Sequence, residues 1–148
     1  MTVDFAVLMN KPVEDAERPK AAPAGTYLAG IISHEFGTST KKGTPYCRFN
    51  FQLLAAQDDV DEEALNEAGG VEFLNKKRMR YEFYLTDDAM FRLREFLEEA
   101  LELSCSGRNF DEVVPETANM QVLVNIVHTL SDDGKDTYAN IDTFAKAA

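Results

Sequence analysis

Two segments of the chain, residues 46–54 and 76–85, alternate strictly between apolar and other side chains. A period of two residues is typical of a β-strand with one buried face and one solvent-facing side. These segments therefore predict neighbouring strands of a sheet that has one apolar and one polar face. The apolar side holds Cys47, Phe49, Phe51 and Leu53 in the first segment, and Met79, Tyr81, Phe83 and Leu85, beside Lys77, in the second.

Three further segments are rich in the aromatic and β-branched residues that favour strands. Gly30 in the first of them indicates a bulge or bend. Apolar residues at helical spacing predict one amphipathic helix over 86–103, which the Thr86 hydroxyl caps. Residues 104–120 are expected to be irregular. The predicted strands are 27–36, 46–54, 76–85, 121–130 and 136–144.

The predicted order is three strands, one helix and two strands. This order is expected of the OB-fold, a five-stranded Greek-key barrel with a helix between strands three and four. An open antiparallel sheet with one helix packed on it has a similar order and is the alternative. The fold class is mainly β in both cases, and 148 residues suffice for a single core.

Two regions fall outside this framework. Residues 1–24, rich in proline and charge, predict a flexible leader, and the apolar stretch 5–9 within it is a candidate for docking on the domain or on a second copy. The OB-fold domain is expected over 25–148. Residues 57–72 predict an acidic loop insertion in that domain, with one or two helical turns.

The distribution of charge is more informative than its sum. The 15 basic and 26 acidic residues give a net charge of −11, which argues against coating of nucleic acid through bulk charge. Seven basic residues nevertheless lie between positions 41 and 80. On the predicted barrel they map to the first loop and to strands two and three, the face where OB domains bind oligonucleotides.

Aromatic and amide side chains accompany these cations on the polar side of the strands. Cations hold phosphates, flat rings stack on bases and amides donate hydrogen bonds, a combination suited to binding a single strand without sequence readout. The candidate DNA-binding residues are Lys41, Lys42, Tyr46, Arg48, Lys76, Arg78, Arg80, Tyr84, Phe36 and Tyr138.

Pairing of strands two and three would bring like charges together. Arg48 is expected across from, or diagonal to, Arg78 or Arg80, and a bound polyanion would relieve that repulsion. The alternative interpretation is an ordinary solvated face, in which the arginines are neutralised by Glu82, Glu35 or Glu72.

The sequence shows no catalytic, cofactor or metal-binding motif. His34 and His128 are isolated, and the acidic run 58–63 lacks the spacing and the glycine of a calcium loop. We therefore expect no enzyme, no cofactor and no metal. Cys47 and Cys105 predict free thiols in a reducing cytoplasm, and the lack of a signal peptide or a long apolar run predicts a protein without a membrane partner.

Three segments carry a resemblance to a known family: KKGTPY, YLTDDAMFRL and SDDGKDTYANIDTF. Together with their surroundings, from about residue 25 to 144 without the acidic insertion, they resemble small single-stranded DNA-binding proteins encoded by bacteriophages. The resemblance implies an OB-fold that coats single-stranded DNA in phage replication or recombination, in the cytoplasm of the infected bacterial host. It implies replication or recombination proteins as candidate partners, with a homo-oligomer left open.

Two other classes of function compete with this one. An acidic adaptor or DNA mimic, acting on a host or phage enzyme, would use the negative surfaces and is the alternative. The net charge motivates it, as does the ending TFAKAA, because many proteins of the resembled family carry an acidic tail there. A nuclease or other enzyme ranks third.

Overall fold

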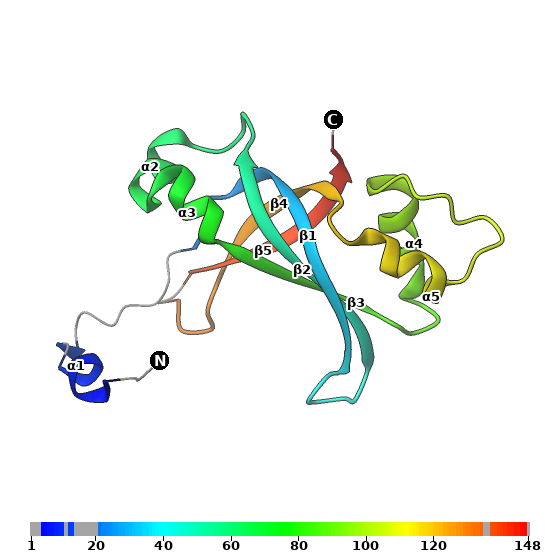
Figure 1. Cartoon of the computed structure of the whole chain (residues 1–148), viewed down its shortest axis with the longest axis horizontal. Helices are drawn as coiled ribbons and strands as arrows, with labels where there is room; N and C mark the ends of the chain where they lie inside the picture. Colours follow the sequence, from blue (N-terminus) through cyan, green and yellow to red (C-terminus); the bar gives the residue numbers. More distant parts are fainter. Residues whose placement is uncertain (1–3, 11, 14–20, 135–136, 148) are drawn as a thin grey trace.

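The computed structural model is mainly β, with one five-stranded antiparallel sheet and a few short helices (Figure 1). It describes residues 4–10, 12–13, 21–134 and 137–147. No helix in those ranges is both long and apolar enough to cross a membrane. The strands are β1 (Gly25–Thr38), β2 (Pro45–Ala56), β3 (Arg78–Tyr84), β4 (Gln121–Leu130) and β5 (Thr137–Lys146).

Strand β2 forms as its alternation predicts and supplies the centre of the core. Cys47, Phe49, Phe51 and Leu53 are fully buried, whereas the residues between them remain partly exposed. Burial of each large side chain contributes about 1.5–3 kcal/mol, so this one strand provides a substantial part of the core. Both cysteines are free thiols as predicted, and burial raises the pKa of Cys47 to about 11.

The sheet has the order β3-β2-β1-β4-β5, and every neighbouring pair is antiparallel. Two residues, Ile32 of β1 and Leu54 of β2, are left over in the β1–β2 register and form bulges. Gly30 pairs regularly with Gln52 between them, so the predicted irregularity of this strand lies at Ile32 instead. A bulge shifts every following side chain of a strand to the other face.

Strand β1 is longer than its partner β4. It pairs with β4 only as far as Gly30 and continues beside β2 alone to Thr38. The part of the sheet beyond Gly30, here called the arm, therefore contains β1, β2 and β3 without β4, and it ends in the turn of residues 39–44. Figure 1 shows this turn and the β4–β5 turn projecting toward the same side of the molecule.

The two edge strands, β3 and β5, approach each other through aromatic side chains. The Phe144 ring lies 5.0 Å from Tyr81, 5.8 Å from Phe83 and 4.7 Å from Phe96, measured between ring centroids. Within the described ranges, no backbone ladder joins β3 to β5. The sheet is thus open in its hydrogen bonding, while its edges share one aromatic cluster.

The acidic insertion is helical, as the sequence suggests, but longer than predicted. It contains α2 (Glu62–Ala68) and α3 (Gly70–Lys76). The prediction that a strand begins at Lys76 is therefore wrong, because Lys76 closes α3 and β3 begins two residues later. Lys76 and Lys77 are both polar, so alternation alone could not locate the start of the strand.

A carboxylate joins the insertion to the start of the sheet. The two oxygens of Asp59 accept hydrogen bonds from the backbone N–H and the hydroxyl of Thr26, each at 2.8 Å. These hydrogen bonds lower the pKa of Asp59. The neighbouring Gly25 has a φ of +139°, and a Cβ there would lie 2.7 Å from the Val60 side chain, so only glycine fits this close approach.

The segment after β3 differs from the single helix predicted over 86–103. It contains α4 (Met90–Glu95) and the π-helical turn η2 (Phe96–Ala100). The Thr86 carbonyl accepts from the N–H groups of Ala89 and Met90, so Thr86 starts a turn rather than capping a helix. Residues 104–120, predicted to be irregular, contain α5 (Phe110–Val113) and the 3-10 turn η3 (Val114–Thr117).

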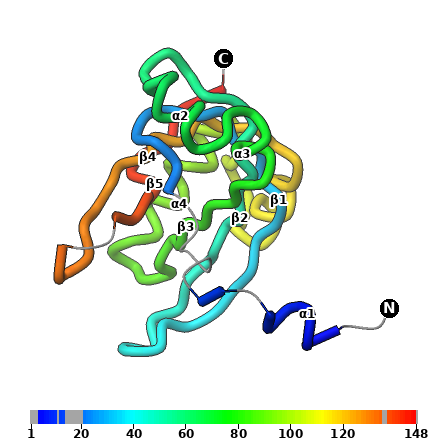
Figure 2. The backbone as a smooth tube through the Cα atoms, turned by 90° about the vertical axis from the view of Figure 1, so that its left-hand side faces the viewer, coloured from blue at the N-terminus to red at the C-terminus, as the bar shows by residue number. Residues whose placement is uncertain are grey.

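The leader holds a short helix, α1 (Phe5–Met9), whose apolar side chains are exposed. Figure 2 shows α1 apart from the sheet. The end of the leader is packed against the domain: Ala22 is fully buried, and its carbonyl lies 2.7 Å from Nε2 of His128. The Tyr27 hydroxyl donates to the Pro23 carbonyl at 2.6 Å. Contacts with the domain therefore begin before residue 25.

Candidate nucleic-acid interface

The solvent side of β1, β2 and β3, here called the polar face, is arranged in cross-strand rows. Each row contains one residue from each strand, because the β1–β2 and β2–β3 registers align. In order from the arm inward, the rows are Gly37–Tyr46–Tyr84, Glu35–Arg48–Glu82, Ser33–Asn50–Arg80 and Gly30–Gln52–Arg78.

Arg48 occupies the middle of the second row and is paired on both sides. Its Nη2 lies 2.7 Å from Oε1 of Glu82, and its Nη1 lies 3.3 Å from Oε1 of Glu35. The hydrogen bond to Glu82, followed by the one to Glu35, raises the pKa of the guanidinium. Arg80 does lie diagonal to Arg48 in the register, but the predicted repulsion is offset by these two carboxylates.

Tyr46 and Tyr84 face each other in the first row, yet their surroundings differ. The Tyr46 hydroxyl accepts a hydrogen bond from Arg48 at 3.0 Å, and the Arg48 guanidinium carbon lies 4.9 Å from the centre of the Tyr46 ring. Tyr46 is thus engaged within the face. Tyr84 keeps 44% of its surface exposed, which leaves its ring accessible to a base.

The two amide side chains of the polar face, Asn50 and Gln52, donate hydrogen bonds to other groups of the protein. The Gln52 amide donates to the carbonyls of Leu74 and Asn75 at 2.9 and 2.7 Å, and so caps the end of α3. The Asn50 amide donates to the Ser33 hydroxyl at 3.0 Å. The amide donors, which the sequence predicts as hydrogen-bonding groups for a single strand, thus bind other groups of the protein in this structure.

A cavity of about 560 Å³ lies between the arm and the start of α4. Lys41 and Lys42 line it from the β1–β2 turn, and Tyr84 and Thr86 line it from the end of β3. This cavity brings three of the predicted residues together: two ammonium groups and one exposed ring. Within the described part of the chain, neither lysine forms an ion pair.

A second cavity, of about 510 Å³, separates the edge strands β3 and β5. Arg78 and Arg80 line it on the β3 side, and Asn140 lines it on the β5 side. Both arginines are exposed, and neither has a carboxylate partner among the residues that the structure describes. The polar face therefore has one group of available cations at each end.

Three predicted residues lie apart from these two groups. Phe36 follows the bulge at Ile32 and pairs with Cys47, so it is on the opposite side of the arm, 64% exposed, with its ring 5.6 Å from that of His34. Tyr138 lies on β5 opposite Thr129 and is 40% exposed. Lys76 is exposed in the last turn of α3.

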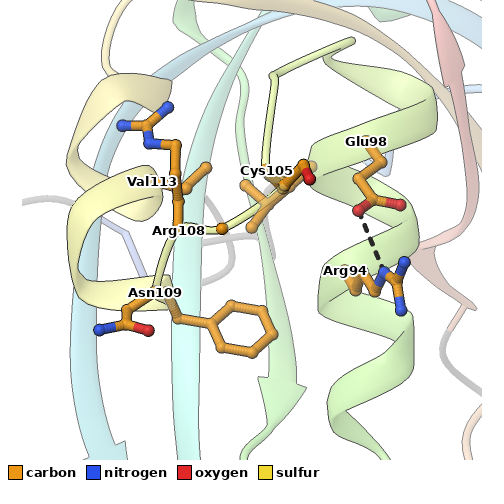
Figure 3. Close-up of a pocket in the computed structure, with 10 residues that line it drawn as sticks. Arg94, Glu98, Cys105, Arg108, Asn109 and Val113 are labelled. Atoms are coloured by element: carbon orange, nitrogen blue, oxygen red, sulfur yellow. Dashed lines mark hydrogen bonds and ion pairs between the residues drawn. The ribbon is translucent and has the colours of Figure 1, made fainter.

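Sequence reasoning did not foresee a cavity of about 430 Å³ between the α4–η2 segment and α5 (Figure 3). Arg94 and Arg108 line it from opposite walls. Arg94 pairs with Glu98 at 3.0 Å, and Arg108 pairs with Glu112 and Glu116. The four-residue spacing of these charges was the available signal, and it indicates internal pairing rather than a site for an anion.

The described residues contain no group of three or more His, Cys, Asp or Glu side chains that could hold a metal ion. Comparison of the sequence with known protein families finds no match, and comparison with curated proteins finds none either. The interpretation of the polar face therefore depends on its geometry and chemistry.

Proposed function

We propose that the chain is a non-enzymatic protein that binds single-stranded DNA without sequence readout, through the polar face. The arrangement that carries the proposal is one exposed ring, Tyr84, on the same face as two groups of available cations. Lys41 and Lys42 share a cavity with that ring, and Arg78 and Arg80 follow along the same strand. Stacking on an aromatic ring combined with cations for the backbone suits a single strand.

The topology supports an OB-fold as the framework of this function. The order β3-β2-β1-β4-β5 places β3 and β5 at the edges that a five-stranded Greek-key barrel would bring together. The aromatic contacts of Phe144 with Tyr81 and Phe83 lie between those edges. The β1–β2 and β4–β5 turns project to one side, and the corresponding loops of OB domains flank the oligonucleotide.

The resemblance to phage proteins suggests the setting. We propose that the chain coats single-stranded DNA during phage replication or recombination in the cytoplasm of a bacterial host. The net charge of −11 fits this role, because an acidic body surrounding a narrow basic face disfavours indiscriminate binding of duplex DNA.

The test is fluorescence anisotropy of a labelled oligo-dT, titrated at several salt concentrations. Four phosphate contacts, one for each available cation, give a plot of log affinity against log salt with a slope of roughly −3, at about 0.7 per contact on single strands. Replacing Arg78 and Arg80 by Gln should reduce the slope by about 1.4.

A matched pair of arginines provides the control. Arg92 and Arg94 of α4 are also exposed and two residues apart, but they line cavities beside Phe144 and beside α5 and not the polar face. The double change Arg92→Gln and Arg94→Gln removes the same charge and should leave the slope unchanged. Absence of binding at low salt would reject the proposed function. If both double variants reduce the salt slope equally, the DNA does not bind specifically at the polar face.

One observation favours the alternative of an acidic adaptor or DNA mimic. Carboxylates outnumber cations in the second row of the polar face, and the first turn of α2 presents Glu62 and Glu63. An adaptor would bind a basic surface of an enzyme instead of DNA. This alternative would be supported if oligo-dT does not bind at low salt and the wild-type chain binds an enzyme instead. That binding should be lost when the acidic residues of 58–72 are neutralised.

A further inference from the structure

The row Glu35–Arg48–Glu82 crosses the middle of the polar face. All three guanidinium nitrogens of Arg48 are engaged: Nε and Nη2 bind Glu82, Nη1 binds Glu35, and Nη2 also donates to the Tyr46 hydroxyl. A guanidinium offers the same donors to a carboxylate as to a phosphate. Glu35 and Glu82 therefore already occupy the N–H donors of Arg48 that a phosphate would need.

The charge of this row is opposite to that of its surroundings. Two carboxylates and one guanidinium leave one net negative charge between the lysines of the β1–β2 turn and the arginines of β3. A DNA backbone that crosses the face passes this point between two groups of cations. A phosphate placed next to this row is repelled by the row's net negative charge. The row therefore weakens the binding of DNA at the centre of the polar face.

We propose that Glu35 and Glu82 are internal competitors for phosphate at Arg48, and that they hold the affinity for single-stranded DNA below what the cations of the face would otherwise provide. This inference rests on the proposed function. Its consequence is that Arg48 contributes little to binding in the wild-type chain, although it lies at the centre of the face. Glu35, with 52% of its side chain exposed, is the carboxylate that a phosphate displaces more easily, and Glu82, with 34% exposed, is held more closely.

The experiment compares the wild-type chain with Glu35→Gln/Glu82→Gln in the oligo-dT titration across salt. We expect the double variant to bind about tenfold more tightly, because one charge-assisted contact becomes available. Its salt slope should steepen by about 0.7, which corresponds to one further phosphate. A merely structural role of the row would not change the number of phosphates that the slope reports.

Two comparisons isolate the cause. Glu62→Gln/Glu63→Gln changes the net charge equally on α2 and should leave the slope unaltered. Adding Arg48→Gln to the double variant should cancel both gains, because Arg48 is the group that holds the additional phosphate.

The single change Glu35→Gln replaces only the longer contact, at 3.3 Å, and serves if the double variant does not fold. It should give a smaller gain of the same sign. If the wild-type chain binds DNA but neither variant gains affinity beyond the α2 control, the inference is wrong and the proposed function stands. If no chain in the series binds, both are wrong.

Discussion

Tyr46 lies directly across from Gly37 in the β1–β2 pair, and its ring fills the space above that glycine. A Cβ at residue 37 would lie 2.6 Å from the Tyr46 oxygen and 2.8 Å from its Cζ. The same hydroxyl accepts a hydrogen bond from Arg48. The missing side chain of Gly37 thus sets the position of the ring and, through it, that of the guanidinium.

The change Gly37→Ala should therefore destabilise the protein by about 1 kcal/mol, the low end of the cost of overpacking, because the added Cβ meets the far end of a half-buried side chain. Tyr46 must move, and its hydrogen bond with Arg48 is strained or lost. Urea denaturation, followed by circular dichroism, measures the difference in the free energy of unfolding.

The cost should disappear when the ring is removed. In a Tyr46→Ala background, Gly37→Ala meets no ring, so the double-mutant cycle should give a coupling of about 1 kcal/mol or more. An equal cost in both backgrounds would show that the backbone at residue 37, rather than the ring of Tyr46, disfavours alanine.

The buried Tyr27 gives a prediction at high pH. Burial, and to a smaller extent the charge of Asp59, raise its pKa from 10.0 to about 12. Because the folded pKa lies above the unfolded one, the stabilisation is fully present below about pH 10 and is lost as the pH rises through about 12. A titration of tyrosinate absorbance should show one late group, which is absent in Tyr27→Phe.

The same variant tests the hydrogen bond of Tyr27. Tyr27→Phe leaves the buried carbonyl of Pro23 without its donor, so we expect a loss of about 1–3 kcal/mol at neutral pH. Tyr84→Phe, at the exposed end of β3, is the matched control and should have little effect. A Tyr27→Phe chain as stable as the control would mean that the end of the leader does not depend on this contact.

Asp59 gives the corresponding prediction at low pH. The hydrogen bonds from Thr26 lower its pKa below 3.8, so the stabilisation is present above that pH and is lost as the pH falls through the folded pKa. Asp59→Asn should therefore be less stable than wild type at neutral pH, and the difference should shrink on acidification. Urea midpoints of both chains over that range measure it.

The adjacent exposed Asp58 supplies the control for this comparison. Asp58→Asn removes the same charge without breaking the two hydrogen bonds to Thr26. If Asp58→Asn and Asp59→Asn lose the same stability with the same pH dependence, general charge and not the Thr26 contact is responsible.

Strands β2 and β3 could be predicted because a two-residue period is visible within six or more residues, and the other three strands because they are rich in aromatic and β-branched residues. The short helices could not be predicted equally well: α5 spans four residues, and α4 passes into η2 after six, so neither completes two regular turns of helical periodicity. The amides of Asn50 and Gln52 were placed on the correct face, but their partners depend on contacts that local sequence does not encode.

The site illustrates how one residue changes an interpretation. Strict alternation along β1 would put Glu35 on the side of Tyr27 and Ile31, which face the core. The bulge at Ile32 reverses the sides, so that Glu35 joins the polar face and Phe36 leaves it. A bulge adds a single residue and has no distinctive sequence signal. The sequence therefore allows the ion pairs of Arg48 as one alternative, but it does not distinguish them from unpaired arginines.

Tyr84 provides a prediction that separates stacking from charge. Its ring is exposed and lines the cavity that Lys41 and Lys42 share, and removal of one base–aromatic contact costs about 1–3 kcal/mol. Tyr84→Ala should therefore weaken oligo-dT binding by a factor of about 5 to 150. The salt slope should stay the same, because the number of phosphates held is unchanged.

Tyr84→Phe keeps the ring and should bind as wild type does. A Tyr84→Ala chain with undiminished affinity would assign the stacking to another ring, and a changed slope would show that Tyr84 positions the lysines instead.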